Sequence, residues 1–155
     1  MKAWSPAAWL VIALAAAPAN AQTMPPQEYM DRARELLAEL IEIDTTDSER
    51  GDNTVAAHAM ADALLEAGFP EQDVQVLVPS DAPTKGNLVA RSRGRDSSLK
   101  PILLLAHIDV VEALPEDWSS DLNPFEFIER DGYYYGRGVK DDKDEAAIYA
   151  ANLIR

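Results

Sequence analysis

Apolar and polar positions alternate with the period of a helix in three parts of the chain. Between residues 27 and 43, apolar side chains recur three or four positions apart among charged ones, as on one side of an amphipathic α-helix. A second helix is expected to begin with an N-cap at Asn53 or Thr54 and to end at Gly68, because glycine tolerates the backbone conformation that stops a helix. The helical pattern returns over residues 142–155.

Short apolar runs predict strands at 74–78, 87–91 and 102–106. The run 102–106 is apolar at every position, which is typical of a strand whose sheet is covered by helices on both sides. We therefore expect it to be an interior strand. A hairpin is expected at 125–129 and 133–135, because Asp131 and Gly132 between them favour a tight turn. The order of elements predicts an α/β fold with a mixed sheet flanked by helices.

The beginning of the chain has the pattern of an export signal. Residues 7–17 form an apolar run, and Ala19 and Ala21 flank a candidate cleavage site before Gln22. A membrane anchor is the alternative, but the run is shorter than the roughly 20 residues that a spanning helix needs. We therefore assign residues 1–21 to a signal peptide and expect the mature protein to be secreted or periplasmic.

Composition narrows the chemistry. A chain of 155 residues with 47% hydrophobic residues can bury a core. Acidic residues outnumber basic ones by 27 to 14, giving a net charge of -13, and no basic cluster stands out, which argues against a nucleic acid partner. Cysteine is absent, so disulfides, thiolate zinc sites and a cysteine nucleophile are excluded. Any metal ion must be held by His, Asp and Glu.

Two polar residues directly follow the run 102–106. His107 and Asp109 lie two positions apart, so their side chains project to the same side of an extended chain. There the carboxylate can orient the imidazole of a metal-binding histidine, at the end of a strand, where open α/β sheets bind ligands. Taken alone, such a triplet is more often a strand-end histidine that caps backbone groups.

Paired carboxylates follow a glycine-containing segment. Gly136 and Gly138 permit a tight backbone path before Asp141 and Asp142. The two carboxylates cannot face one way on a single element, so we expect one to enter a site and the other to cap the following helix. A carboxylate held at a helix start can bridge two cations. The alternative is a solvated first helical turn whose acidic residues match the helix dipole.

Together these segments resemble the di-zinc metallopeptidase family of aminoacylases, glutamate carboxypeptidases, dipeptidases and succinyl-diaminopimelate desuccinylases. The H-x-D-V-V block at 107–111, Trp118, Asn-Pro-Phe at 123–125 and the G-R-G-x-x-D-D-K block at 136–143 occur in the family's order. The resemblance identifies residues 22–155 as the N-terminal part of the zinc peptidase catalytic domain. It implies that the chain is truncated before the family's general-base glutamate and remaining zinc ligands.

The resemblance also implies residue roles. His107 would ligate one zinc ion, Asp141 would bridge two zinc ions in the complete enzyme, and Asp109 would be the catalytic partner that orients His107. The implied reaction is zinc-dependent hydrolysis of an amide or peptide bond in a peptide or an N-acyl amino acid. With these two ligands alone the chain is expected to bind zinc weakly. The resemblance is compatible with a homodimer of the complete protein. We do not expect stable insertion in a membrane after the signal is cleaved.

Two other classes of function compete with this hypothesis. One is a secreted, non-catalytic α/β binding module that retains the fold, and the other is a single-metal or calcium-binding hydrolase, although the D-x-D-x-D-G spacing of a calcium loop is absent. His58 is expected on a helix surface, and no base role is assigned to Glu145. A downstream Glu-Glu pair and histidine in frame would favour the enzyme, whereas a stop codon after Arg155 would favour the binding module.

Processing of the leader is the first testable prediction. Because small residues at Ala19 and Ala21 follow an apolar run, we expect exported protein to begin at Gln22. N-terminal sequencing of secreted material checks this. Secreted material that still carries residues 1–21 would show that the leader is not a cleaved signal.

Overall fold

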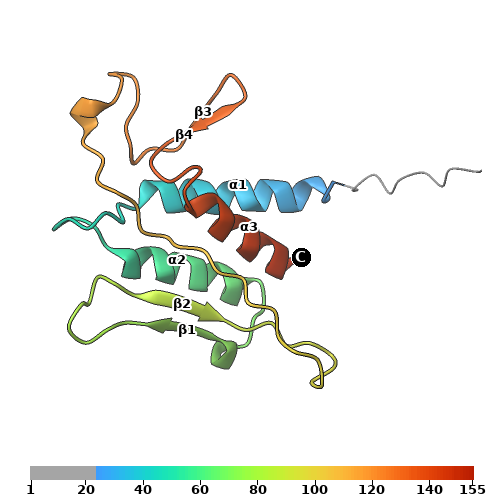
Figure 1. Cartoon of the computed structure of the whole chain (residues 1–155). Helices are drawn as coiled ribbons and strands as arrows, with labels where there is room; N and C mark the ends of the chain where they lie inside the picture. The colour runs from blue at the N-terminus through green and yellow to red at the C-terminus, as the bar shows by residue number, and fades with distance from the viewer. Residues whose placement is uncertain (1–23) are drawn as a thin grey trace, which may run out of the picture.

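The structure, a computed structural model, describes residues 24–155, which contain three α-helices, two short 3₁₀-helices at Glu71–Asp73 and Pro115–Asp117, and two small hairpins (Figure 1). The signal peptide assigned to residues 1–21 lies outside this part. Within it, no helix is long and apolar enough to cross a membrane. The helices are α1 (Gln27–Glu42), α2 (Asn53–Glu66) and α3 (Lys143–Ile154), and the strands are β1 (Val74–Leu77), β2 (Asn87–Ala90), β3 (Ile128–Arg130) and β4 (Tyr133–Tyr135).

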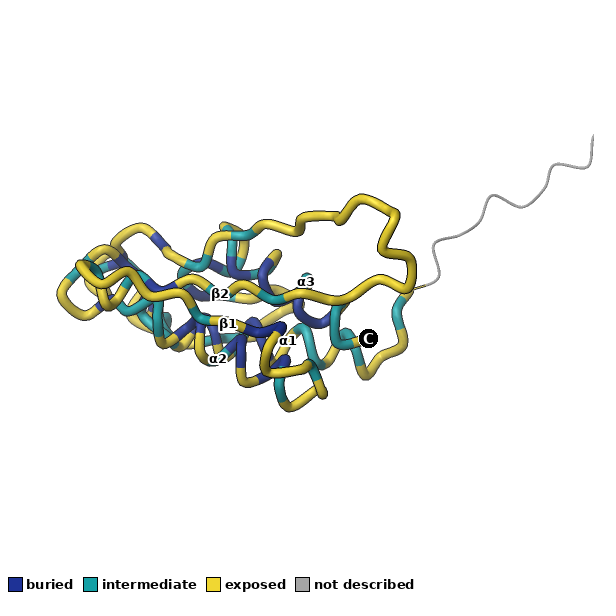
Figure 2. The backbone as a smooth tube through the Cα atoms, turned by 90° about the horizontal axis from the view of Figure 1, so that it is seen from below, coloured by how far each residue is buried: buried dark blue, intermediate teal, exposed yellow. Residues whose placement is uncertain are grey.

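The core lies where the helices meet. α1 packs against α3, and α2 covers the hairpin of β1 and β2. Leucine and isoleucine side chains of α1 are buried against a row of alanines on α3, and these small side chains let the two helices approach closely. Buried positions lie mainly in the helices, while the connection after β2 is exposed (Figure 2). The buried residues of α1 and α3 are Leu36, Leu37, Leu40, Ile41, Ala146, Ala147, Ala150 and Ala151.

Both sheets are antiparallel two-stranded hairpins. β1 pairs with β2, so that Val74 lies opposite Ala90, and β3 pairs with β4, so that Ile128 lies opposite Tyr135. The second hairpin turns through Asp131 and Gly132, which both have positive φ angles, 55° and 79°. This is the backbone of a tight primed turn; the predicted Asp-Gly hairpin is confirmed, with its first strand at 128–130 and not at 125–129.

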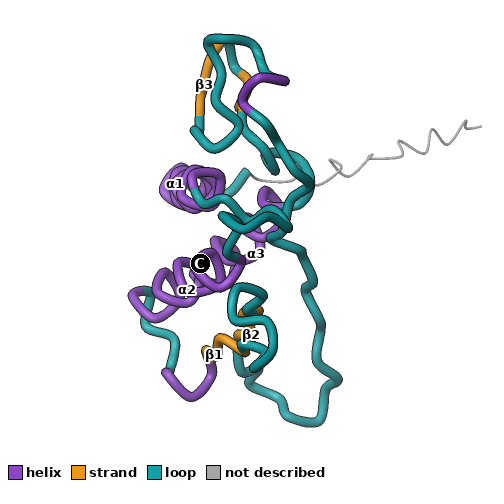
Figure 3. The backbone as a smooth tube through the Cα atoms, turned by 90° about the vertical axis from the view of Figure 1, so that its left-hand side faces the viewer, coloured by secondary structure: helices purple, strands orange, loops and turns teal. Residues whose placement is uncertain are grey.

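The α/β class is confirmed, but the expected interior strand at 102–106 is wrong. This stretch is extended loop in the structure, drawn among the loops of Figure 3, and the side chains of Ile102 and Leu103 are 88% and 81% exposed. A strand needs a neighbour for its backbone N–H and C=O groups. Within residues 24–155 each strand pairs only inside its own hairpin, so the mixed pairing expected for this run does not form.

The start of α2 is shifted by one residue from the expected cap. Asp52, and not Asn53, is the N-cap: its carboxylate Oδ1 accepts hydrogen bonds from the backbone N–H of Thr54 (2.8 Å) and of Val55 (3.1 Å). These are N–H groups that have no partner inside the helix. At the other end Gly68 has a φ of 93° and follows the helix as expected.

An ion pair between buried Asp73 and the largely exposed Arg93 closes the first hairpin. The Asp73 side chain, 1% exposed, accepts hydrogen bonds from the Nε (2.8 Å) and an Nη (2.6 Å) of Arg93. Its backbone oxygen accepts from the N–H of Arg91 at 2.8 Å. The hydrogen bonds from Arg93 hold the pKa of the Asp73 carboxyl below its ordinary value, although burial acts in the opposite direction.

This ion pair predicts a specific dependence of stability on acid. Because the pKa of Asp73 is lower in the folded than in the unfolded chain, the pair stabilises the fold above the unfolded pKa of about 4, and this contribution is lost as the pH falls through the folded pKa. Asp73→Asn should therefore be less stable than wild type near neutral pH, and the difference should shrink in acid. Urea unfolding measured across that pH range checks this, with exposed Asp81→Asn as the control. A difference that stays constant with pH would contradict it.

Candidate functional site

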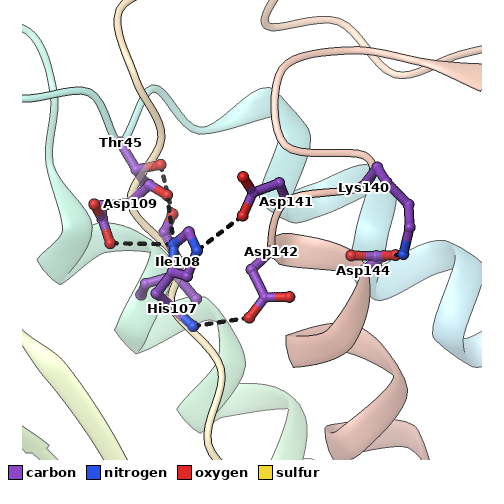
Figure 4. A network of polar contacts seen from close by, with 8 residues as sticks. All are labelled: Thr45, His107, Ile108, Asp109, Lys140, Asp141, Asp142 and Asp144. Carbon is purple, nitrogen blue, oxygen red and sulfur yellow. Dashed lines mark hydrogen bonds and ion pairs between the residues drawn. The ribbon is translucent and has the colours of Figure 1, made fainter.

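The two motif segments meet and together line a cavity of about 240 Å³. His107 and Asp109 come from the loop that follows 102–106, and Gly138 and Asp141 come from the segment that leads into α3. His107 and Asp141 are 34 positions apart in the sequence, yet Nε2 of the imidazole lies 3.0 Å from Oδ1 of the carboxylate. The structure therefore brings together the three residues singled out in the sequence (Figure 4).

The imidazole of His107 lies between two aspartates. Its Nδ1 is 3.1 Å from the backbone oxygen of Asp109 and 3.4 Å from the carboxylate Oδ1 of the same residue. A carbonyl oxygen can only accept a hydrogen bond, so Nδ1 carries the proton. In a neutral imidazole Nε2 then presents a lone pair toward the Asp141 carboxylate, which is also an acceptor. A positive charge, either a second ring proton or a cation, is needed to make this contact favourable.

The pKa of His107 reflects the same arrangement. Partial burial is the largest single influence and lowers the pKa of the imidazole, but the hydrogen bonds to Asp109 and Asp141 and the charges of both aspartates together outweigh it, so the pKa lies above its ordinary value. The side chains remain accessible, with exposures of 52% for His107 and 87% for Asp141. The site therefore attracts positive charge and is open to solvent.

The donors fit part of a metal site. Imidazole nitrogen and carboxylate oxygen are donors that zinc accepts, and zinc usually takes about four ligands. Across residues 24–155 the structure holds no group of three or more His, Asp or Glu side chains arranged to hold one ion. His107 and Asp141 thus match the nitrogen and oxygen donors of such a site without completing it.

Asp142 does not cap α3 as expected. It occupies the N-cap position, but its side chain makes no capping hydrogen bond. Its Oδ2 instead accepts from the backbone N–H of His107 at 3.2 Å, and the peptide between Asp141 and Asp142 is cis. Both carboxylates therefore contact His107, one at the ring and the other at the backbone. The sequence shows that two aspartates are adjacent, but it does not show that one contacts the ring of His107 and the other its backbone N–H.

Thr45 is a further contributor that the sequence analysis missed. It is fully buried, and its hydroxyl donates to the backbone oxygen of Ile108 at 2.7 Å. The N–H of Val110 donates to the backbone oxygen of Thr45 at 3.2 Å. These bonds hold the backbone on both sides of Asp109 against the turn after α1. No spacing rule marks Thr45, because its part of the sequence shows only a polar interruption between two helices.

Lys143 is the second residue whose role was missed. Its side chain is fully buried, and its ammonium donates to the backbone oxygens of Leu40 (2.7 Å) and Ile43 (2.9 Å). Burial lowers the pKa of Lys143 to about 8, while the Asp44 carboxylate acts in the opposite direction. The lysine therefore fastens the start of α3 to the end of α1.

His58 and Glu145 contribute nothing to the site, and Arg137 of the second motif lines the cavity without bonding to the imidazole. His58 is exposed on α2, as expected. The carboxylate of Glu145 accepts from the hydroxyl of Tyr149 at 3.1 Å. The guanidinium carbon of Arg137 lies 5.7 Å from the centre of the Trp118 ring. None of these side chains contacts His107 through a hydrogen bond or ion pair in the described part of the chain.

Comparison with known proteins matches the same segments. Residues 103–155 match the model of the peptidase family M20/M25/M40. The chain is 32% identical over 135 residues to the mouse N-fatty-acyl-amino acid synthase/hydrolase PM20D1, covering 83% of this chain and 26% of that protein. It is 44% identical over 63 residues to pig aminoacylase-1, covering 40% and 15%. It is 31% identical over 99 residues to succinyl-diaminopimelate desuccinylase of Rickettsia prowazekii, covering 64% and 25%.

The chain thus spans about a quarter or less of the length of these relatives. The family model covers both His107 and Asp141, and it ends at Arg155. The match with the mouse relative covers most of the chain. The similarity therefore extends well beyond the short motifs.

The second motif segment depends on the glycine at position 138 for its backbone path, and this gives a prediction about stability. It has a φ of +97°, and a Cβ there would lie 2.9 Å from Cδ of Lys143 and 3.0 Å from Cγ1 of Val110. Gly138→Ala should lower the free energy of unfolding by about 1–3 kcal/mol through the left-handed backbone alone, with crowding adding to that loss. Urea unfolding measures it. Gly94→Ala, where a Cβ meets nothing within 4 Å, is the control, and equal stability of both variants would contradict the prediction.

Proposed function

We propose, from the premise that this chain belongs to peptidase family M20/M25/M40, that it supplies the first metal ligands of an enzyme that hydrolyses amide or peptide bonds. The observation that carries the proposal is the direct 3.0 Å contact between the His107 ring and the Asp141 carboxylate at the edge of an open cavity that both residues line. The unprotonated Nε2 of His107 and the Asp141 carboxylate are both hydrogen-bond acceptors, so a cation bound to both would stabilise their close contact. The family match supplies the reaction class.

Each residue then has one role. His107 would bind a metal ion through Nε2, because Nδ1 is engaged by Asp109. Asp141, whose carboxylate has two oxygens and is largely exposed, would be the ligand shared by two ions. Asp109 fixes the orientation and the tautomer of the imidazole through its backbone oxygen and its carboxylate, which raises the basicity of the ligand nitrogen.

Zinc is the metal that these donors favour. Histidine nitrogen and aspartate oxygen are common zinc ligands, and cysteine is absent from the chain. A pair of zinc ions, when bound, polarises the scissile carbonyl and lowers the pKa of a bound water. The residues of this chain would hold the metal and orient its ligands. His107 and Asp141 would fix the position of the metal, and Asp109 keeps the imidazole aligned. With only these ligands the 155-residue chain should bind zinc weakly.

The proposed substrates are N-acyl amino acids or peptides. The relatives are named for N-fatty-acyl-amino acids, for aminoacylase activity and for removal of succinyl from succinyl-diaminopimelate. These names share an acyl group on an amino acid, which supports an amide bond as the scissile bond here. The leader pattern at residues 1–21 supports a secreted or periplasmic site of action.

The test replaces the proposed bridge in the product of the gene's full open reading frame. Asp141→Ala should abolish turnover and remove most bound zinc, because the ligand shared by both ions is lost. Asp109→Ala should retain more metal, since loss of an orienting partner typically lowers metal affinity or activity by roughly 10- to 100-fold. Zinc content and hydrolysis of N-acyl amino acids and dipeptides are the measurements.

Glu145→Ala is the matched control, because this carboxylate lies on α3 and pairs only with Tyr149 among the described contacts. It should behave as wild type. Full activity of Asp141→Ala, or undiminished activity after thorough chelation, would overturn the di-zinc assignment.

A further inference from the structure

Lys143 is the largest fully buried side chain of the described residues. An ammonium taken out of water is costly unless hydrogen bonds replace its hydration. Here the partners are neutral backbone carbonyls, those of Leu40 and Ile43 at the end of α1. The last carbonyls of a helix carry partial negative charge and lack partners within the helix. Lys143 donates to both from 103 and 100 positions along the chain, and the Leu40 oxygen also accepts a long hydrogen bond from the Ile43 N–H at 3.3 Å.

α1 has no cation of its own at this end. Its last turn contains no basic residue, and Lys143 supplies the missing positive charge. The lysine stem also lies under the motif segment, since a Cβ on Gly138 would meet Lys143 Cδ at 2.9 Å. Lys143 therefore fixes both the start of α3 and the backbone that leads to Asp141, two positions before it.

The same end of α1 also holds the other half of the site. The turn formed by residues 40–46, here called the α1 turn, contains Thr45. The Thr45 hydroxyl and backbone oxygen bind the backbone of Ile108 and Val110, at 2.7 and 3.2 Å. The backbone that carries His107 is thus attached to the element that holds Lys143.

The direct contacts between the two motif segments are exposed. The His107 and Asp141 side chains are 52% and 87% exposed, and exposed ion pairs contribute little to holding a geometry. Lys143 and Thr45 are both fully buried, and they make short hydrogen bonds. The rigid link between the segments therefore passes through the α1 turn.

We propose that the α1 turn is the positioning element of the metal site, setting Asp141 against His107 through the positioning residues Lys143 and Thr45. This inference rests on the proposed function. Neither residue touches the metal or the substrate. Both act by fixing the separation of the two ligands.

The main test is Lys143→Met in the product of the full open reading frame. Methionine keeps an apolar stem and removes the donors to the α1 turn. Zinc affinity and kcat should each fall by roughly 10- to 100-fold, as for loss of other groups that orient ligands, with KM little changed. The absorption spectrum of the cobalt-substituted protein should shift, because the angle between the ligands changes. A residue that serves stability alone would lower Tm and leave the cobalt spectrum and the zinc affinity of the folded protein unchanged.

Lys140→Met is the matched control. It removes an ammonium from the same segment, but that ammonium is 89% exposed and pairs with Asp144 at 3.2 Å. Zinc affinity and the cobalt spectrum should stay as in wild type.

Thr45 tests the same element if Lys143→Met does not fold. Thr45→Val removes the hydroxyl at nearly constant shape and should weaken zinc binding and shift the cobalt spectrum, whereas Thr45→Ser keeps the hydroxyl and should restore both. Folded Lys143→Met with wild-type zinc affinity and cobalt spectrum would overturn the proposal, as would a Thr45→Val protein identical to wild type.

If Asp141→Ala also behaves as wild type, the proposed metal site itself fails. If only Asp141→Ala is impaired, the metal site stands and the positioning role fails.

Discussion

The buried ammonium of Lys143 on the last carbonyls of α1 is the contact on which the rest of the arrangement depends. It joins two helices that are far apart in the sequence, and it does so at the end of α1, where the Leu40 oxygen has only a long backbone hydrogen bond, from the Ile43 N–H at 3.3 Å. The alanines of α3 reinforce the contact, because small side chains let the helix lie close enough for the lysine to reach. The chain immediately before Lys143 is then confined to one path, and that path carries Asp141 and Asp142.

The exposed part of the site has the opposite character. His107 and Asp141 meet where water can reach them, and a neutral imidazole would direct a lone pair at the carboxylate. The contact between His107 and Asp141 is stabilised only when positive charge is present. The contacts of Lys143 and Thr45 are stabilised by burial and by hydrogen bonds to backbone oxygens. The raised pKa of His107 indicates that the site stabilises positive charge. Under the proposed function, the buried contacts of Lys143 and Thr45 would hold the exposed imidazole and carboxylate in position for a cation.

Most of the fold could be predicted because local signals decide it. Helical periodicity located the helices, and the Asp-Gly pair located the second hairpin, since both depend on residues near one another. The motifs also predicted that His107, Asp109 and Asp141 would meet. The capping of α2 was misplaced by one residue because Asp52, Asn53 and Thr54 can all accept from backbone N–H groups, and only the backbone path selects Asp52.

Residues whose partners are distant could not be predicted in the same way. Lys143 and Thr45 bind backbone atoms, which every residue has, so no sequence pattern identifies the partner. Asp142 looked like a helix cap because local rules favour it there, but the N–H of His107 competes successfully for its carboxylate. The run 102–106 has the composition of a buried strand. An apolar composition predicts that the residues will be buried, but it does not show which strand pairs with them.

The unpaired run 102–106 bears directly on how well His107 is held. On its C-terminal side the backbone of His107 continues into residues fixed by Thr45. On its N-terminal side it continues into an exposed apolar stretch outside both hairpins. The histidine backbone is therefore fixed mainly from one direction, together with one hydrogen bond that its N–H donates to the Asp142 carboxylate. Metal affinity depends on the number of ligands and on how firmly they are held in place. A strand paired with 102–106 would improve the second of these even without adding a ligand, because it would fix the His107 backbone from both sides.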